Sequence, residues 1–267
     1  MPAPDSVADT ALLADVLRRA GEIARHYYGG KYRSWNKSRG NPVTEADIEI
    51  DRFLKQTLLS ARPGYGWLSE ETEDDPARLQ REFVFIVDPI DGTYGFLKQR
   101  PHFTIVAAVV RQGRPVSAAI FNPITGEMFE AAKGAGAKKN GTAISASDRS
   151  GFDGARILAE QKLMDPARWT TPWPDTLTSE TRASAAYRIA LVAAGEFDAT
   201  FSLTRKSDWD VAAGDLIVHE AGGVMTDRDG NRLAYNRANT EHGSVICAGP
   251  RIHVELLARL KDYRPET

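Results

Sequence analysis

Residues 83–93 read FVFIVDPIDGT, an apolar run that leads directly into two aspartates, a proline and a Gly-Thr step. The run predicts a buried strand that ends where the turn-forming residues begin. Asp88 and Asp91 would then lie close together at the carboxyl end of this strand, where like charges repel unless a cation lies between them. The Gly-Thr step opens a short helix over residues 94–99, whose free N–H groups suit a phosphate. The stretch therefore predicts metal-binding acids beside an anion site, which favours phosphoryl chemistry.

Length and composition narrow the class of protein. The chain has 267 residues, of which 42% are hydrophobic and 26% charged, as expected for one large globular domain or two modest ones. The net charge of −2 argues against a nucleic acid polymer as partner. The single cysteine, Cys247, excludes an internal disulfide and a cysteine zinc site. No apolar segment approaches the ~20 residues of a membrane span, and the start lacks the layout of a signal peptide. We expect a cytoplasmic protein that does not bind membranes.

The first half of the chain predicts an α+β region. A helix with an apolar stripe from Leu12 to Ala24 precedes a polar, basic segment, and a second helix runs from Thr44 to the break at Pro63. Trp35 and Trp67 are expected to pack in the core or against the partner domain. The strands expected next lie at residues 66–69, 83–87, 103–110, 115–121 and 128–132, and the last three resemble an antiparallel meander.

The second half predicts alternating strands and helices after a polar, glycine-containing stretch around residues 145–154. The expected strands are 156–159, 199–202 and 244–248, and the expected helices are 184–194, 209–221 and 251–260. Together the two halves predict a layered α/β sandwich with an N-terminal α+β domain, residues 1–150, and a C-terminal α/β domain, residues 151–267. We expect the active site in the cleft between them.

Four further motifs accompany the stretch at 83–93. They are NPVTEAD at residues 41–47, LSEE at 68–71, SAAY at 184–187 and WDVAAG at 209–214. Their order and spacing resemble the inositol monophosphatase superfamily of magnesium-dependent, lithium-sensitive phosphatases. The resemblance extends from the first helix to the last, and the acidic motif followed by Trp-Asp about 120 residues later is highly specific. It implies the αβαβα sandwich of the sugar phosphatases and a homodimer.

The resemblance also implies a set of metal ligands. Magnesium would be bound by carboxylates and one backbone carbonyl, from Glu70, Asp88, Asp91, Asp210 and Ile90. Hard Mg²⁺ prefers such oxygen ligands and keeps waters that can be activated. Two ions about 3.5–4 Å apart can hold the attacking and leaving oxygens of an in-line displacement. In some family members a third, weaker ion lies near Glu70 and Asp47.

Catalytic and substrate roles follow from the same resemblance. Glu70 would take part of the proton of the attacking water as general base, and Thr93, paired with Asp47, is the other candidate for orienting that water. The N–H groups of Gly92 and Thr93 would bind the phosphate. The full set of expected phosphate and substrate contacts is Gly92, Thr93, Ser184, Arg182, Arg205, Lys206 and Asp210.

Simpler explanations exist for several of these acids. Asp47 stands three residues after Thr44, so it suits the acidic position of a capping box. Asp210 in a first helical turn suits the helix dipole. Glu71 and the acids that follow it suit a solvated loop. Asp88 and Asp91 are harder to explain in this way, because an unpaired carboxylate in a buried strand is costly.

The substrate is less well defined by the sequence. Inositol-specific members carry a glutamate seven residues before the Trp-Asp aspartate, where this chain has Leu203. Arg182, Arg205 or Lys206 could instead meet a second phosphate, because guanidinium and ammonium groups bind phosphate oxygens. Residues 96–104 look like the 3′(2′),5′-bisphosphate nucleotidase branch, which implies hydrolysis of adenosine 3′,5′-bisphosphate. Inositol-1-phosphate or another sugar phosphate is the alternative substrate, and a non-catalytic phosphometabolite-binding protein is the remote alternative.

Overall fold

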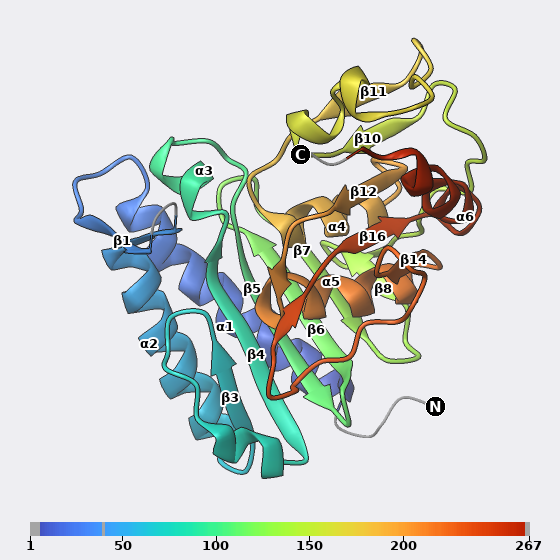
Figure 1. Cartoon of the computed structure of the whole chain (residues 1–267). Coiled ribbons are helices and arrows are strands. Elements are labelled where there is room, and N and C mark those ends of the chain that lie inside the picture. Colours follow the sequence, from blue (N-terminus) through green and yellow to red (C-terminus); the bar gives the residue numbers. More distant parts are fainter. Residues whose placement is uncertain (1–5, 39–40, 265–267) are drawn as a thin grey trace.

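A seven-stranded sheet lies at the centre of the computed structural model, which describes residues 6–38 and 41–264 (Figure 1). Its strands, in spatial order, are β3 (Gly66–Ser69), β4 (Phe83–Asp91), β5 (Thr104–Arg111), β6 (Arg114–Asn122), β7 (Glu127–Ala132), β8 (Ala137–Lys139) and β9 (Thr142–Ala143). β3 runs parallel to β4, and every other neighbouring pair is antiparallel. The predicted meander is therefore confirmed.

Two pairs of helices cover the two faces of this sheet. α1 (Ser6–Tyr27) and α2 (Glu45–Ala61) pack on one face, and α4 (Ala185–Ala193) and α5 (Asp208–Glu220) pack on the other. Alternate residues of β4 serve the two faces, because side chains in a strand point alternately up and down. Phe85 and Val87 join the core beneath α1 and α2, whereas Val84 and Ile86 join the core beneath α4 and α5. An apolar run without polar alternation is therefore a strand buried on both faces.

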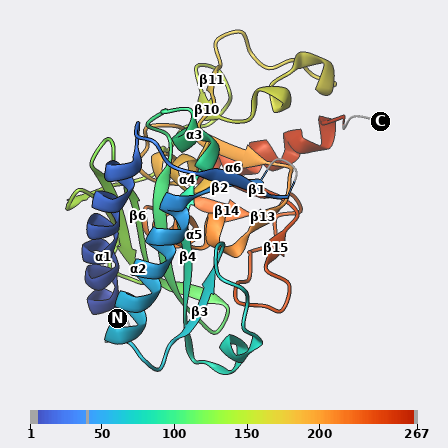
Figure 2. The same cartoon turned by 90° about the vertical axis from the view of Figure 1, so that its left-hand side faces the viewer.

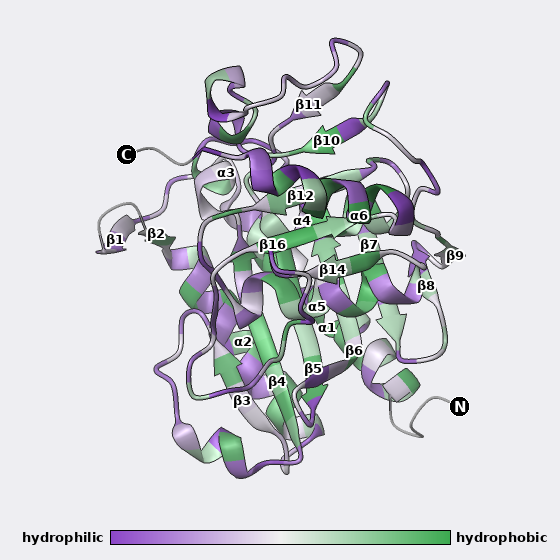
Figure 3. Cartoon of the chain, turned by 45° about the vertical axis from the view of Figure 1, so that its right-hand side comes forward, coloured by the Kyte–Doolittle hydropathy of each residue, from purple (hydrophilic) through white to green (hydrophobic). Residues whose placement is uncertain are grey.

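A second sheet and a last helix complete five layers. The sheet contains, in spatial order, β11 (Thr178–Glu180), β10 (Arg156–Leu158), β12 (Ala199–Ser202), β16 (Val245–Ala248) and β14 (Val224–Thr226). α4 and α5 lie between the two sheets, and α6 (Pro250–Arg259) packs on β16. Figure 3 shows hydrophobic residues along the strands of both sheets and hydrophilic ones on the outer helices and loops. The predicted layered α/β sandwich is confirmed.

Two short antiparallel pairs of strands were not predicted. β1 (Ser34–Ser38) and β2 (Asn41–Thr44) form one, which lies beside the short helix α3 (Thr93–Leu97), as Figure 2 shows. β13 (Lys206–Ser207) and β15 (Glu241–His242) form the other. All five residues of β1 are exposed. Its sequence therefore lacks the alternation of apolar and polar residues that predicts a half-buried strand. Four 3₁₀ helices, at Pro76–Gln80, Gln161–Leu163, Pro166–Arg168 and Leu260–Asp262, complete the elements of the described ranges.

The expectation for Trp35 was wrong, because its exposed fraction is 47% on the solvated strand β1. Trp67 is buried as expected, on β3. None of the helices within residues 6–38 and 41–264 is long and apolar enough to cross a membrane.

The contact between α4 and α5 provides a test of the layered core. A Cβ atom at Gly214 of α5 would lie 2.7 Å from Cγ2 of Ile189 on α4, so no side chain fits there without movement. We expect Gly214→Val to lower the free energy of unfolding by about 1–3 kcal/mol through overpacking, as measured by urea unfolding. Gly64→Val is the matched control, since nothing lies within 4 Å of a Cβ there. An equal loss of stability in both variants would contradict the packing described here.

Candidate active site

An irregularity at the end of β4 brings two aspartates to the same side of the strand. Asp88 pairs with Val106 of β5 and Asp91 pairs with Thr104, so β4 has one residue more than β5 between the two pairs. Residues three apart in a regular strand point to opposite faces, but the extra residue of a bulge cancels that alternation. Pro89, inside the irregular part, has no N–H group to leave unpaired.

Asp210 completes a cluster of three carboxylates. One oxygen each from Asp88, Asp91 and Asp210 lie within 4.8 Å of one another. Asp88 and Asp91 come from the end of β4, whereas Asp210 is the third residue of α5. Acids more than a hundred residues apart in the sequence therefore converge on one point.

The N-termini of two helices stabilise these acids. Asp91 accepts hydrogen bonds from the Ser184 hydroxyl at 2.5 Å and the Ala186 amide at 2.6 Å, both at the start of α4. Asp210 accepts one from the Ser207 amide at 2.6 Å, at the start of α5. Unpaired N–H groups and the helix dipole favour negative charge at such positions. The structural explanation for Asp210 is thus compatible with metal binding, because the same geometry serves both.

Asp88 has an oxygen that no other residue satisfies. Its side chain is 1% exposed, and its Oδ1 accepts a hydrogen bond of 3.0 Å from the Ile90 amide. Its Oδ2 is buried and has no hydrogen-bond partner among the described residues. Burial first, and then the charges of Glu70, Asp91 and Asp210, raise the pKa of Asp88 well above its usual value. A buried carboxylate oxygen without a partner is costly, and a bound cation would remove that cost.

The pKa values of Asp210, Asp47 and Glu71 are raised as well. Burial, together with the charge of Asp91, raises the pKa of Asp210 to about 7. Burial raises the pKa of Asp47 to about 6, although hydrogen bonds from Thr44 oppose the shift. Burial also raises the pKa of Glu71 to about 7. The donor set of the cluster consists of carboxylate oxygens, which suits a hard cation such as Mg²⁺.

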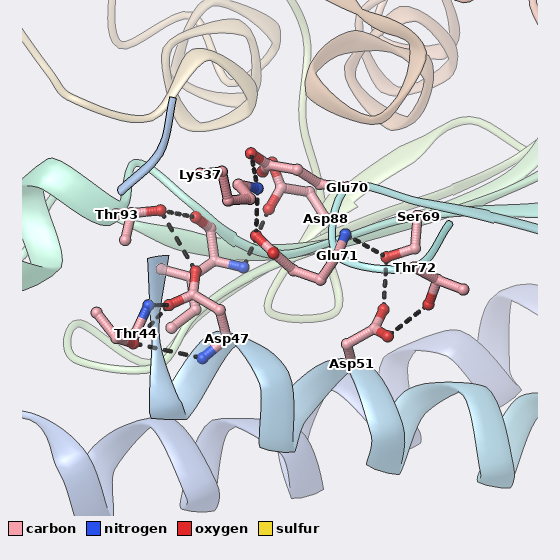
Figure 4. A network of polar contacts seen from close by, with 11 residues as sticks. Lys37, Thr44, Asp47, Asp51, Ser69, Glu70, Glu71, Thr72, Asp88 and Thr93 are labelled. Carbon is pink, nitrogen blue, oxygen red and sulfur yellow. Dashed lines mark hydrogen bonds and ion pairs between the residues drawn. The ribbon is translucent and has the colours of Figure 1, made fainter. Parts of the chain in front are cut away.

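Thr93 and Asp47 form the predicted pair (Figure 4). The Thr93 hydroxyl lies 3.3 Å from Oδ1 of Asp47 and 3.1 Å from the carbonyl oxygen of Ile90. Oδ2 of Asp47 accepts hydrogen bonds from the amide and hydroxyl of Thr44, at 2.8 and 2.5 Å, so the capping box is also present. Asp47 therefore fixes the start of α2 and contacts Thr93 at the same time.

Glu70 lies beside a lysine and a second glutamate. β3 and β4 are parallel, so Glu70, directly after β3, reaches the same edge of the sheet as Asp88. Nζ of Lys37, on β1, lies 2.9 Å from Glu70 and 2.8 Å from Glu71. Burial lowers the pKa of Lys37, but the two carboxylates outweigh burial and raise it overall.

The turn that carries these glutamates has its own support in Asp51 (Figure 4). Asp51, on α2, accepts hydrogen bonds from the hydroxyls of Ser69 at 2.5 Å and Thr72 at 2.6 Å. These two residues flank Glu70 and Glu71, so Asp51 fixes both ends of the turn.

A cavity of about 450 Å³ opens over the carboxylates. Its lining includes the predicted metal and phosphate residues Glu70, Asp88, Ile90, Asp91, Gly92, Thr93 and Asp210. It also includes the predicted cations Arg182 and Lys206, and three residues for which the sequence analysis gave no role, Tyr94, Glu160 and Arg188. Arg188 is the single charged residue of α4, whose sequence is AAYRIALVA; a lone charge in an apolar helix is the signal that could have identified it.

Other predicted contacts lie elsewhere. Ser184 is buried behind Asp91, to which it donates a hydrogen bond, so it positions a carboxylate. Arg205 does not line the cavity; its side chain is 78% exposed and pairs with Glu241 at 3.0 Å. Leu203 packs against the core of the second sheet and lines a different cavity.

The raised pKa values predict how stability depends on pH without metal. The folded protein holds protons on Asp47 up to about pH 6 and on Asp210 and Glu71 up to about pH 7, whereas these acids titrate near pH 4 when unfolded. The folded state binds more protons in this window, so stability should fall as pH rises from about 4 to about 7. Thermal unfolding in EDTA at about pH 5 and pH 8 measures the effect.

Asp210→Asn is the control for this prediction, because it removes one of the shifted groups. Its midpoint should fall less between the two pH values than that of the wild type, and saturating Mg²⁺ should reduce the fall in the wild type. An identical pH dependence in the variant would contradict the electrostatic account of the cluster.

Comparison with known proteins agrees with this geometry. The family model described as the inositol monophosphatase family matches residues 6–264. An inositol-1-monophosphatase of Rhizobium meliloti is 34% identical over 249 residues, which cover 89% of this chain and 90% of the relative. The Nus factor SuhB of Escherichia coli K12 is 30% identical over 255 residues, 92% of each chain.

Solved structures show the same fold. The SuhB protein of Bartonella henselae superposes with a TM-score of 0.81 at 28% identity, covering 95% of this chain and 98% of that one. The IMPase of Thermotoga maritima superposes with a TM-score of 0.79 at 26% identity, covering 93% and 95%. The chain therefore belongs to the inositol monophosphatase family and is a phosphoric monoester hydrolase of a magnesium-dependent kind.

Proposed function

We propose that this chain hydrolyses a small phosphate monoester at the cluster of Asp88, Asp91 and Asp210, with Mg²⁺ as cofactor. The observation that carries the proposal is the buried Oδ2 of Asp88, which has no hydrogen-bond partner among the described residues and lies beside two more carboxylates. We assign the ions to Glu70, Asp88, Asp91, Asp210 and the carbonyl of Ile90, with two ions and a weaker third as the working number. Bound Mg²⁺ would neutralise the phosphoryl oxygens and lower the pKa of a water molecule.

The protein's own groups would orient that water. Asp47 and the Ile90 carbonyl are both acceptors within reach of the Thr93 hydroxyl, so a lone pair on the Thr93 oxygen is left to accept a hydrogen bond from water. Glu70, which lies 2.9 Å from Nζ of Lys37, would take part of the proton of the water. Thr93 and Glu70 both line the cavity.

The phosphate would be held by the start of α3. Gly92 has a φ of +91° and precedes α3, and the first amides of a helix have no partner within the helix. A Cβ at Gly92 would lie 2.8 Å from the Ser184 amide nitrogen, so only glycine allows this close approach. Phosphate oxygens suit amides presented in this way.

Adenosine 3′,5′-bisphosphate is the substrate we propose, with inositol-1-phosphate as the alternative. Lys206, which lines the cavity and has no acidic partner among the described residues, supports a substrate with a second phosphate. Arg182 also lines the cavity, but it is paired with Glu180. The alternative is supported by the 34% identity with the Rhizobium meliloti inositol-1-monophosphatase. Leu203 stands where inositol-specific members carry a glutamate, but it does not line the cavity. The absence of that glutamate is therefore weaker evidence against inositol-1-phosphate as substrate. Lithium inhibition, a homodimer, a cytoplasmic location and the division at residue 150 are further proposals from the family resemblance.

Asp88→Asn tests the proposed metal site. The substitution removes a charged ligand while it keeps the shape of the side chain, so we expect phosphate release in Mg²⁺ to fall by about 100-fold or more. The fold should persist, because the change also removes repulsion from Asp91 and Asp210. Circular dichroism would check the fold, and a phosphate-release assay the activity. Turnover close to that of the wild type would refute the assignment.

Substrate preference is tested by direct comparison. We expect kcat/KM for adenosine 3′,5′-bisphosphate to exceed that for inositol-1-phosphate by about 10-fold or more, since one additional charged hydrogen bond is worth about 1.5–3 kcal/mol. Phosphate release from each substrate at matched concentrations gives the ratio. A ratio well below one would favour the alternative substrate. Nucleotide binding without phosphate release in Mg²⁺ would support the non-catalytic reading.

A further inference from the structure

We propose that Arg188 and Lys206 form a second anion subsite in the cavity, which binds a phosphate carried by the leaving group of the substrate. The proposal rests on the proposed function, and it names the residues that select the class of substrate. It requires that these two cations lack acidic partners among the described residues and reach the same space as the scissile phosphate.

Arg188 is a buried guanidinium at the cavity wall. It is 6% exposed and lies on α4, one turn after Ser184, which bonds Asp91. Its Nη1 donates a hydrogen bond of 3.1 Å to the carbonyl oxygen of Arg182, which fixes the orientation of the group. Its Nε is buried and has no hydrogen-bond partner among residues 6–38 and 41–264.

Lys206 lies beside Arg188 and also lacks an acidic partner. Both side chains line the catalytic cavity, and both line a small adjoining pocket walled by Phe201 and Val245. Nζ of Lys206 contacts the Thr204 hydroxyl and the Arg205 carbonyl, each at 3.3 Å. No carboxylate of the described chain lies within ion-pairing distance of either cation.

The other charges at this end of the cavity are already paired. Arg182 forms an ion pair of 2.6 Å with Glu180, and Glu160 forms one of 2.9 Å with Lys162. Arg188 and Lys206 are therefore the cations left to meet a ligand in the described lining.

The negative charges of the metal-binding acids do not explain the buried positive charge of Arg188. Asp91, Glu160 and Asp210 influence it electrostatically, but none of them forms an ion pair with it. Glu160 is paired with Lys162. Mg²⁺ would take the charge of Asp91 and Asp210, after which the guanidinium would lose the compensation that these two acids offer. Burying a charge without a partner is costly, so the group is best explained by a ligand that pairs with it.

A phosphate matches this pair of cations better than a neutral hydroxyl does. The guanidinium offers planar donors suited to two phosphate oxygens, and the ammonium adds a point charge. The preferred class of substrate is a bisphosphate in which one phosphate reaches the carboxylate cluster and the other reaches Arg188 and Lys206.

Two matched pairs of compounds test the subsite. Adenosine 3′,5′-bisphosphate is compared with adenosine 3′-monophosphate, and fructose 1,6-bisphosphate with fructose 1-phosphate. We expect the wild type to prefer the bisphosphate by about 10- to 100-fold in kcat/KM in at least one pair, mainly through KM. Arg188→Gln should bring that ratio close to one. The matched control Arg205→Gln, whose arginine is exposed and outside the cavity, should keep the ratio of the wild type.

Thermal unfolding separates a subsite from a structural role. Without ligand, Arg188→Gln should melt at the wild-type temperature or above it, because it removes an unpaired buried charge; a lower midpoint would indicate a structural role and overturn the proposal. A ratio near one in both pairs for the wild type, or a preference that persists in Arg188→Gln, would also overturn it. If no monoester is hydrolysed at all, including inositol-1-phosphate, the proposed function itself fails.

Discussion

The site is built around repulsion among three carboxylates, of which Asp88 and Asp91 are buried and Asp210 is half-buried. Asp88, Asp91 and Asp210 bring an oxygen each within 4.8 Å of one another. Unit charges at such a distance repel strongly where the effective dielectric constant is low, so the arrangement is unfavourable without a cation. The protein tolerates this cost because the same acids create a strong binding site for a divalent ion. The same geometry therefore lowers the stability of the metal-free protein and raises its affinity for a divalent metal ion.

The layered fold supplies this geometry through the ends of its elements. The parallel pair β3 and β4 places Glu70 and Asp88 at one edge of the sheet, and the bulge in β4 adds Asp91. α4 and α5, held between the two sheets, direct their N-termini at Asp91 and Asp210. Rigid core elements thus hold the acids in place, and the cavity above them is left for the substrate.

Sequence reasoning was most successful where local pattern and chemistry agree. The apolar run of β4 and the acids that follow it predicted both a buried strand and the carboxylate pair, because burial and charge rarely coincide without a function. It was least successful where the role of a residue depends on tertiary packing. Arg205 and Lys206 are adjacent and both basic, yet only Lys206 reaches the cavity. Trp35 is exposed because its strand is exposed on both sides. Arg188 owes its place at the cavity wall to burial, and the lone charge in the apolar helix α4 was the local signal for it.

The site combines an acidic half, suited to metal, with a cationic half formed by Arg188 and Lys206. Metal binding by the acidic half can be observed directly. Crystals soaked in Mn²⁺, a cation with the same preference for oxygen ligands, should show an anomalous-scattering peak within bonding distance of Asp88, Asp91 and Asp210. Well-ordered crystals in which these carboxylates point apart, with no such peak between them, would contradict the account.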